Sequence, residues 1–392
     1  GSHGPARITR NSYDAASQLT AIQKAYGTSL QQTYAAYSYS SNGKMKTLTD
    51  ANGNLAQMDY DGFDRQSHWY FPSKTTPGQI NTADYEQYGY DAAGNRTSLR
   101  KRDGSVLTFQ YDSLNRMTMK IVPERAGLSS THTRDVYYGY DLRGQPAYAR
   151  FDSAPGEGVT NAYDAFGRLT ASTLTMDGVS RSVGSGYDPA GVRTALTFPD
   201  GNVVNYYRDS RSRLYYAGLN GSGYLFYPPY TTDDKVTALY RLITSTGAWG
   251  TSDAMNGFSY DTIGRVSDIT TGLAGASFDS SVSFVRNPAS QLTSVTRTND
   301  AYAWTGAVSV DRSYTANGLN QYAAVAGTAY QYDANGNLTF DGTQTYLYDV
   351  ENRMVSRSGA GSTAALRYDP LGRLYEVTSS TSGTTRFLYD GD

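Results

Sequence analysis

The stretch Tyr163–Leu169, with the sequence YDAFGRL, decides the fold of this chain because near-copies of it recur along almost its whole length. Clear copies are YDAAGNR at Tyr90, YDTIGRV at Tyr260 and YDPLGRL at Tyr368. A unit that recurs at a spacing of about twenty residues indicates an array of one supersecondary structure. The array therefore has to be understood before any motif inside it.

The aromatic residue that opens each copy serves as the anchor for aligning the array. Spacings run from 16 residues, between Tyr332 and Tyr348, to 30 residues, between Tyr60 and Tyr90. The longer intervals are expected to hold protruding loops, and they are 60–90, 111–140, 230–260 and 284–314. The aligned anchors are Tyr13, Tyr39, Tyr60, Tyr90, Tyr111, Tyr140, Tyr163, Tyr187, Tyr207, Tyr230, Tyr260, Phe284, Tyr314, Tyr332, Tyr348, Tyr368 and Tyr389.

One repeat predicts two antiparallel strands and two turns. A second large apolar residue precedes most anchors by two places, as Tyr88 precedes Tyr90, and this alternation places both rings on one face of a strand. The aspartate after the anchor can accept backbone N–H groups in the following turn. The glycine four places after the anchor suits the positive φ that such a turn requires. These turn glycines are Gly94, Gly167, Gly191, Gly264, Gly336 and Gly372.

The repeats predict an all-β fold, a continuous antiparallel β-hairpin meander of roughly 34 strands. Open twisted sheets rarely exceed about ten strands without curling, so we expect the strip to coil into a spiral or into part of a hollow β-cocoon shell. The chain has 36 Tyr and 40 Gly, and only 18% of its residues are charged. Tyrosine can cover apolar area while its hydroxyl remains hydrogen-bonded, which suits a thin wall without a deep core.

Composition also limits the classes of function. A net charge of −2 argues against a nucleic-acid binder, which normally shows a basic stripe. No apolar run is long enough to span a membrane, and the absence of cysteine is compatible with export. We therefore expect a secreted or cell-surface protein of bacterial origin, without a signal peptide in this sequence.

The two ends predict the domain organisation. The start Gly1-Ser2-His3 resembles the remnant of an expression tag. Residues 4–392 are expected to form a single array of about 17 repeats. We expect this array to be truncated at both ends relative to a longer native protein.

The unit Tyr-Asp-x-x-Gly-Arg-Leu, with its variant Tyr-Asp-x-x-Gly-Asn-Arg, resembles the YD-repeat or RHS (rearrangement hotspot) family. That family includes bacterial polymorphic toxins, wall-associated proteins, components of insecticidal toxin complexes and the animal teneurins. The resemblance covers nearly the whole chain and implies a β-sheet strip that spirals into a cocoon around a C-terminal toxin. In many members an aspartyl segment near the end of the shell cuts the toxin free. This chain departs from that pattern, because it shows neither the segment nor a toxin.

Two boxes, Asp188–Gly191 and Asp369–Gly372, are similar to the Asp-Pro-x-Gly boxes of the family's self-cleaving segment. Each lies in an ordinary repeat register, so we interpret both as turns in which proline presets φ. The stretches Asp50–Asn54 and Asp333–Asn337 carry alternating oxygen ligands, but Leu occupies the sixth position, where an EF-hand loop requires Gly. They too are interpreted as turns.

His68 and His132 are the only histidines outside the first three residues, and both are interpreted as surface-loop residues. The sequence therefore predicts no catalytic residue, no metal site and no cofactor. An arginine also recurs five or six places after the anchor, as at Arg65 and Arg168. It could stack on neighbouring tyrosines, bind acidic or sugar ligands, or pair with the repeat aspartates in a structural ladder. We favour the structural ladder.

The leading functional hypothesis is a non-enzymatic structural shell fragment that encloses and helps to deliver a toxin segment. The alternative is an adhesion module that binds carbohydrate or a cell-surface partner through exposed aromatic rings. Its candidate ligand-contact residues are Trp69, Trp249 and Trp304. Exposed strand edges also predict edge-to-edge self-association. We expect neither nucleic acid nor a membrane span among the interactions of this chain.

Overall fold

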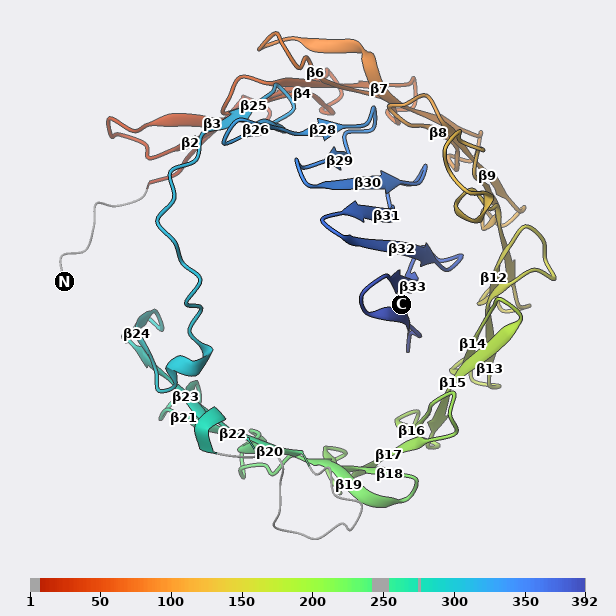
Figure 1. Cartoon of the computed structure of the whole chain (residues 1–392), viewed down its shortest axis with the longest axis vertical. Helices are drawn as coiled ribbons and strands as arrows, with labels where there is room; N and C mark the ends of the chain where they lie inside the picture. Colours follow the sequence, from red (N-terminus) through yellow and green to blue (C-terminus); the bar gives the residue numbers. More distant parts are fainter. Residues whose placement is uncertain (1–7, 242–253, 274–275, 392) are drawn as a thin grey trace. The chain divides into compact units, whose positions relative to one another are not determined.

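The structure is a computed structural model that describes residues 8–241, 254–273 and 276–391 (Figure 1). Within these residues the chain forms 34 β-strands and three short 3-10 helices. Consecutive strands pair antiparallel, as β3 (Gln32–Tyr39) does with β4 (Met45–Asp50). The predicted all-β antiparallel meander is confirmed.

Each hairpin follows from the local sequence, as β11 (Val136–Tyr140) and β12 (Pro146–Phe151) illustrate. The anchor Tyr140 ends the first strand, and a bulge interrupts the register between Gly139 and Tyr140. The N–H of Asp141 then donates to the carbonyl of Gln145 at 2.9 Å, which closes a short turn. Gly144 has a φ of 84°, a left-handed conformation that glycine adopts without steric penalty.

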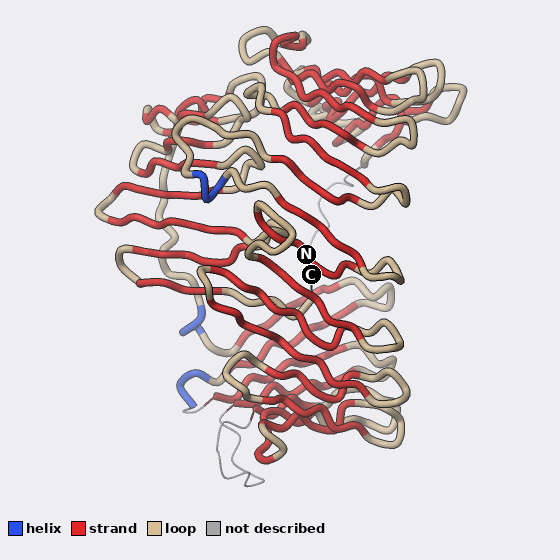
Figure 2. Tube along the Cα trace, turned by 90° about the vertical axis from the view of Figure 1, so that its right-hand side faces the viewer, coloured by secondary structure: helices blue, strands red, loops and turns tan. Residues whose placement is uncertain are grey.

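The two kinds of turn lie at opposite edges of the sheet because successive strands run in opposite directions (Figure 2). We call the turns that follow an anchor the repeat turns, such as 61–65, 112–116 and 141–145. The connections at the other edge are the opposite turns, such as 51–54 and 101–105. Each stretch of sheet therefore has two rows of turns with different residues. The terms repeat-turn edge and opposite-turn edge denote these two rows, not the outermost strands of the sheet.

The described residues divide into two compact units, and the first comprises residues 1–159 and 311–387. It holds the first half of a 24-stranded sheet, β1–β24, together with a three-stranded and a seven-stranded sheet. Besides β3, β4, β11 and β12, its elements are β1 (Arg10–Tyr13), β2 (Leu19–Lys24), β5 (Leu55–Tyr60), β6 (Gln66–Pro72), β7 (Ile80–Tyr90), β8 (Arg96–Arg100), β9 (Val106–Tyr111), β10 (Met117–Ile121), η1 (Ser130–His132), the start of β13 (Gly158–Tyr163), β25 (Tyr314–Ala316), β26 (Tyr322–Val325), β27 (Thr328–Ala329), β28 (Gln331–Tyr332), β29 (Leu338–Phe340), β30 (Gln344–Tyr348), β31 (Met354–Gly359), β32 (Ser362–Tyr368), β33 (Leu374–Ser379) and β34 (Gly383–Arg386).

The second unit comprises residues 160–310 and 388–392. It consists of the remaining strands of the 24-stranded sheet and two single-turn helices. After the end of β13 its elements are β14 (Leu169–Met176), β15 (Val179–Tyr187), β16 (Arg193–Thr197), β17 (Val203–Arg208), β18 (Leu214–Leu219), β19 (Ser222–Tyr227), β20 (Ala238–Arg241), β21 (Ala254–Tyr260), β22 (Val266–Leu273), η2 (Ala276–Phe278), β23 (Ser280–Arg286), β24 (Leu292–Arg297) and η3 (Asp300–Tyr302).

The meander is divided into separate sheets at two places, after β24 and after β27. The 24-stranded sheet ends with β24, and residues 298–313 contain η3 but no strand before β25 begins a new sheet. The strip is therefore three sheets of 24, 3 and 7 strands within the described residues.

The expectation of protruding loops in the longer intervals is only partly met. Much of the interval 60–90 is taken up by β7, a strand of 11 residues. In the interval 111–140 the connection 122–135 is packed into unit 1, where Val122 and Thr133 are buried. The interval 230–260 includes residues 242–253, which lie outside the described residues.

A small apolar core lies in unit 1. Leu107 on β9, Val122 and Val350 are buried together, with Leu99, Phe109 and Leu128 packed around them. Val350 belongs to the repeat turn between β30 and β31, so this core joins the seven-stranded sheet to the first sheet.

Candidate functional site

The repeat turn is built around an aspartate whose carboxylate is used by the turn itself. In the turn 112–116, Asp112 Oδ1 accepts the backbone N–H groups of Leu114 at 2.9 Å and Arg116 at 3.0 Å. Asp112 Oδ2 accepts from Arg116 Nε at 2.8 Å. The Arg116 side chain, with these backbone donors, lowers the pKa of Asp112. The pattern recurs at Asp61, Asp164, Asp209 and Asp261.

The repeat arginine connects its own turn to the next repeat. The Arg65 guanidinium lies over the ring of Tyr90 at 4.7 Å, and its Nη1 donates to the carbonyl of Asp91 at 2.9 Å. Arg168 makes the same pair of contacts with Tyr187, at 4.8 Å, and with the carbonyl of Asp188, at 2.9 Å. These contacts support the structural ladder over the ligand-binding interpretation of these arginines, because the guanidinium is already engaged.

The anchor tyrosine connects each repeat to the one before it. Tyr60 Oη donates to the carbonyl of Met45 at 2.8 Å, and Tyr140 Oη donates to that of Met117 at 2.9 Å. Sequence reasoning placed the ring in the wall but missed the bond, although the choice of Tyr over Phe at nearly every anchor was a signal for it. The hydroxyls of Tyr39, Tyr90, Tyr111, Tyr187, Tyr260, Tyr332 and Tyr368 also donate to backbone carbonyls of earlier strands.

Three aligned anchors do not occupy the position before a repeat turn. The turn follows Arg208 instead of Tyr207, Arg286 instead of Phe284, and Ala316 instead of Tyr314. Alignment by aromatic residues alone misplaced them, because the turn depends on the Asp or Asn that accepts its N–H groups. Arg286 Nη1 even donates to the carbonyl of Val266, the bond that a tyrosine hydroxyl makes elsewhere.

Of the remaining anchors, all but Tyr389 end a strand or lie directly before a repeat turn. Tyr13, Tyr163 and Tyr348 each end a strand, and Tyr230 forms an isolated bridge with Val236. Tyr389 lies beyond β34. The turn glycines Gly94, Gly167, Gly191, Gly264, Gly336 and Gly372 all have φ between 80° and 90°.

In unit 1 the repeat turns of the C-terminal sheets lie against opposite turns of the first sheet. We call each of these contacts between a repeat turn and an opposite turn a joint, and the first joint is polar. Asn320 Nδ2 donates to Asp50 Oδ2 at 2.7 Å, and its Oδ1 accepts from Asn54 at 3.1 Å. Burial alone would raise the pKa of Asp50, but the hydrogen bonds from Asn320 and Asn54 outweigh it and lower the pKa. The N–H of Gly318 also donates to the carbonyl of Lys74 at 3.0 Å.

The second joint inserts Asn335 between two residues of the turn 101–105. The Asn335 carbonyl accepts from Arg102 Nη1 at 3.2 Å, and its Oδ1 accepts from the N–H of Asp103 at 3.0 Å. Arg102 is held in place by Asp84, with Nη2 at 2.6 Å from Oδ2. A turn that resembled a calcium loop in sequence thus uses its oxygens to join two sheets.

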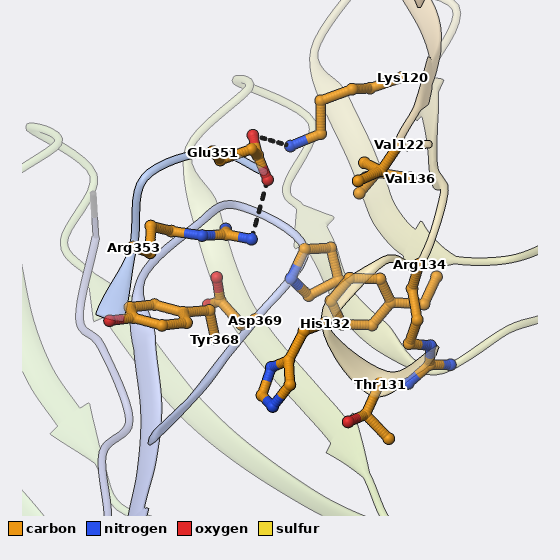
Figure 3. Close-up of a pocket in the computed structure, with 12 residues that line it drawn as sticks. Lys120, Val122, Thr131, His132, Arg134, Val136, Glu351, Arg353, Tyr368 and Asp369 are labelled. Carbon is orange, nitrogen blue, oxygen red and sulfur yellow. Dashed lines mark hydrogen bonds and ion pairs between the residues drawn. The ribbon is translucent and has the colours of Figure 1, made fainter. Parts of the chain in front are cut away.

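The third joint combines an apolar contact with the charged contacts of Lys120, Glu351 and Arg353 drawn in Figure 3. Val350 is 0% exposed against Leu107 and Val122. Next to it, Lys120 Nζ lies 2.6 Å from Glu351 Oε1, and Glu351 also pairs with Arg353 at 2.8 Å. The charges are partly buried yet paired, which limits the desolvation penalty.

His132 lines the same joint, together with the fully buried Asp369 and Pro370 (Figure 3). Burial lowers the pKa of His132, and Arg353 and Arg367 lower it further, whereas Asp349 opposes them. The cavity between these side chains has a volume of about 10 Å³, too small for a substrate. His132 was expected on a surface loop, and that interpretation is wrong because its loop packs into the joint.

The two Asp-Pro boxes both form repeat turns and lie in different units. Asp188 Oδ1 accepts the N–H of Val192 at 2.9 Å. Asp369 Oδ1 accepts the N–H groups of Leu371 and Arg373, each at 3.0 Å. Both carboxylates are therefore engaged in the local turns that the sequence predicted.

A wider, open groove lies over the β3–β6 region of unit 1. Its volume is about 710 Å³, and it is lined by the rings of Tyr39, Tyr60 and Tyr70 with Asp59 and His68 among them. The His68 and Tyr70 rings are stacked with centroids 5.5 Å apart. The groove is broad and polar, and Ser67 Oγ lies 3.3 Å from His68 Nδ1 at its wall.

Of the candidate ligand-contact tryptophans, Trp69 belongs to unit 1 and Trp304 to unit 2. Trp69 on β6 is partly exposed and stacks on Phe71 at 5.2 Å, while Trp304 is exposed in the strand-free segment 298–313. Trp249 lies outside the described residues. Among residues 8–241, 254–273 and 276–391, no cluster of three or more His, Asp or Glu could hold a metal ion. No helix in the described part of the chain is long and apolar enough to cross a membrane.

Comparisons with known proteins agree with the geometry of the repeats. A family model described as RHS Repeat matches residues 90–126. The tRNA nuclease WapA of Bacillus subtilis strain 168 and the tRNA3(Ser)-specific nuclease WapA of Bacillus spizizenii are each 34% identical over 77 residues. That alignment covers 19% of this chain and 3% of either relative.

Solved structures show the same fold over almost the whole chain. The Photorhabdus luminescens Tc holotoxin pore matches with a TM-score of 0.55 and 14% identity, covering 96% of this chain and 19% of the other. The TcdB2–TccC3 complex matches with a TM-score of 0.52 and 14% identity, covering 98% of this chain and 23% of the other. At this identity the likeness concerns the fold alone, and the chain spans only a small part of each relative.

Proposed function

The chain is an RHS/YD-repeat protein, and on that premise we propose that it is a wall segment of a shell that encloses and helps to deliver a toxin segment. The observation that carries this proposal is that the repeated polar side chains form their hydrogen bonds and ion pairs within the sheet itself. Aspartates close turns, arginines bridge to the next repeat, and tyrosine hydroxyls bridge to the previous one. Such a chain contributes a surface and an enclosed space instead of a catalytic centre.

The proposal includes the domain organisation and the location of the protein. In this proposal, the 17 aligned anchors from Tyr13 to Tyr389 belong to one array within a longer polypeptide. Its partner is a toxin segment of that polypeptide, and the whole protein is secreted or displayed at the surface of a bacterium. The likeness in fold to components of Tc toxin complexes supports the comparison with a shell.

The test uses the complete reading frame to which these repeats belong. Limited proteolysis should leave any non-repeat segment intact in the wild type and degrade it in a Val350→Asp variant, which opens the third joint. Ser113→Asp, at an exposed position of the repeat turn 112–116, is the control and should leave protection unchanged. A non-repeat segment cut equally fast in wild type and variant would contradict enclosure, as would a reading frame without such a segment.

A second candidate function, carbohydrate or cell-surface binding, is favoured by a group of tyrosines in unit 2. The rings of Tyr207 and Tyr216 stack at 4.2 Å, and Tyr215 meets Tyr227 edge-on at 5.6 Å. Tyr207 and Tyr215 are exposed, and aromatic faces suit the apolar faces of sugar rings. A glycan array should show binding that Tyr215→Ala abolishes and Tyr34→Ala, an exposed tyrosine of unit 1, leaves unchanged. Silence on the array would contradict this function.

A further inference from the structure

We call the repeat turns of the first sheet in unit 1 the free turns, to distinguish them from the docked turns of the C-terminal sheets, such as 349–353 and 369–373. The free turns carry apolar side chains that no part of the described chain covers. Leu142 is fully exposed in the turn 141–145, Phe63 is 81% exposed in 61–65, and Leu114 is 69% exposed in 112–116. Unit 2 shows the same feature at Phe166 and Ile263. Large apolar residues that recur at one edge of a sheet indicate a surface that another structure covers.

The chain itself shows what covers such an edge. Leu142 follows its turn aspartate directly, and the residues in the same place of the docked turns are Val350 and Pro370. Both are completely buried. Val350 packs on Leu107 and Val122, and Pro370 lies against Gly158, where an added Cβ would come within 2.7 Å of the proline ring. In both cases the covering surface is the opposite edge of another stretch of repeat sheet.

The geometry of the docked turns does not distinguish them from the free ones. In the free turn 112–116 and in the docked turn 349–353, the aspartate accepts N–H groups of its turn and a guanidinium from the arginine at its end. In the free turn 141–145, Asp141 Oδ1 likewise accepts the N–H groups of Arg143 and Gln145. A free repeat turn therefore needs no rearrangement to dock. The fourth residue of the turn has a positive φ in both kinds, 60° at Asn115 and 84° at Gly144 in free turns, and 64° at Asn352 and 80° at Gly372 in docked turns.

The chain also carries an opposite edge that remains uncovered within the described residues. In the opposite turns of the seven-stranded sheet, residues 360–361 and 380–382 are exposed, as is Thr343, and Gly361 has open space around its Cβ position. Free repeat turns and uncovered opposite turns thus occur in one molecule. Two copies can join head to tail through them.

We propose that the repeat-turn edge of unit 1 is an association surface that takes the opposite-turn edge of a second copy of this chain. The joint is heterologous, with Leu142 of one copy placed over the turns between β29 and β34 of the other. It repeats between two molecules the pairing of a repeat turn with an opposite turn that Val350 and Pro370 make within one. The inference goes beyond enclosure of a toxin, since it depends only on the repeat edges.

Sedimentation velocity across a range of protein concentrations tests the association. The wild type should form concentration-dependent oligomers, and Leu142→Asp should weaken the apparent Kd about tenfold or more, because a buried carboxylate would lack a partner. Leu30→Asp is the matched control. Leu30 is 79% exposed but belongs to an opposite turn at 25–31, so the control should associate like the wild type.

Cross-linking distinguishes head-to-tail joining from other contacts. The chain contains no cysteine, so single cysteines can be introduced without background. A bismaleimide should join Leu142→Cys copies to Ala360→Cys copies in a mixture, and it should join Leu142→Cys copies alone only weakly. A wild type that stays monomeric, oligomers that Leu142→Asp leaves intact, or equal cross-linking of Leu142→Cys copies alone would each overturn the proposal.

Discussion

The turns 112–116 and 349–353 are built alike but differ in their surroundings. Both aspartates accept two backbone N–H groups and one guanidinium, and both arginines lie over the tyrosine of the next repeat, Tyr140 or Tyr368. The side chain of Asp112 is 23% exposed, whereas that of Asp349 is 1% exposed. The comparison indicates that the repeat motif determines the conformation of the turn. The packing of another sheet against the turn determines how much the turn contributes to the free energy of unfolding.

The largest difference should appear at the residue that follows the aspartate. Val350→Asp places a carboxylate among Leu107 and Val122 without a partner and should destabilise unit 1 by about 3 kcal/mol or more. Ser113→Asp, at the same place of the free turn, should change the free energy of unfolding by less than about 0.5 kcal/mol. Urea unfolding followed by circular dichroism measures both. Equal effects would show that the two turns do not differ in packing.

Removing the turn aspartate should give the next largest difference. Asp349→Ala leaves Arg353 and two buried N–H groups without their acceptor, with an expected loss of about 2–3 kcal/mol. Asp112→Ala should cost less than Asp349→Ala, because water can reach the exposed donors.

The conservative variant Asp349→Asn separates the charge from the hydrogen bonds. An amide oxygen can still cap the turn, as Asn287 Oδ1 does when it accepts the N–H of Gln291 at 3.0 Å. The loss in Asp349→Asn should therefore lie between those of the wild type and Asp349→Ala. An Asn variant as unstable as the Ala variant would mean that the ion pair with Arg353 dominates the turn.

Removing the anchor hydroxyl should affect docked and free repeats equally. Tyr368 Oη donates to the carbonyl of Met354 at 2.8 Å, and Tyr140 Oη donates to that of Met117 at 2.9 Å. Each bond lies within one sheet, so Tyr368→Phe and Tyr140→Phe should each cost about 1 kcal/mol. Tyr34→Phe, in an exposed ring, is the control. A difference above about 1 kcal/mol between the two anchor variants would show that docking reaches into the sheet.

These contrasts also separate what the sequence could predict from what it could not. The hairpin is local, because Asp112, its two N–H partners and Arg116 lie within five residues, so periodicity and turn chemistry predicted it. The register failed at Arg208, Arg286 and Ala316, where a turn lacks its aromatic anchor.

The joints in unit 1 depend on contacts between residues far apart in the chain. Lys120 and Glu351 are 231 positions apart, and Leu142 and Val350 occupy equivalent places with opposite burial. A repeat pattern in the sequence does not tell which repeat packs against which other repeat. For the same reason, His132 was interpreted as a surface residue although its loop packs against Asp369 and Pro370.

The smallest expected effect is in the pH dependence of stability. The pKa of Asp112 is lowered below its usual 3.8 by Arg116, so its contribution to stability is complete above pH 3.8 and is lost as the pH falls below it. The pKa of His132 is lowered below 6.5 by burial, with further lowering by Arg353 and Arg367. The folded state therefore favours neutral His132, and its contribution is complete above pH 6.5 and declines as the pH falls from that value.

The joint around Val350 should thus weaken at a higher pH than the free turns do. Urea midpoints measured between pH 7.5 and about pH 4 should fall gradually in the wild type. In His132→Gln the midpoint should stay level until the carboxylates begin to protonate, since glutamine does not titrate. Asp349 opposes the effect by favouring the imidazolium, which keeps the expected change small. A His132→Gln profile that parallels the wild type would show that His132 does not distinguish the docked turns from the free ones.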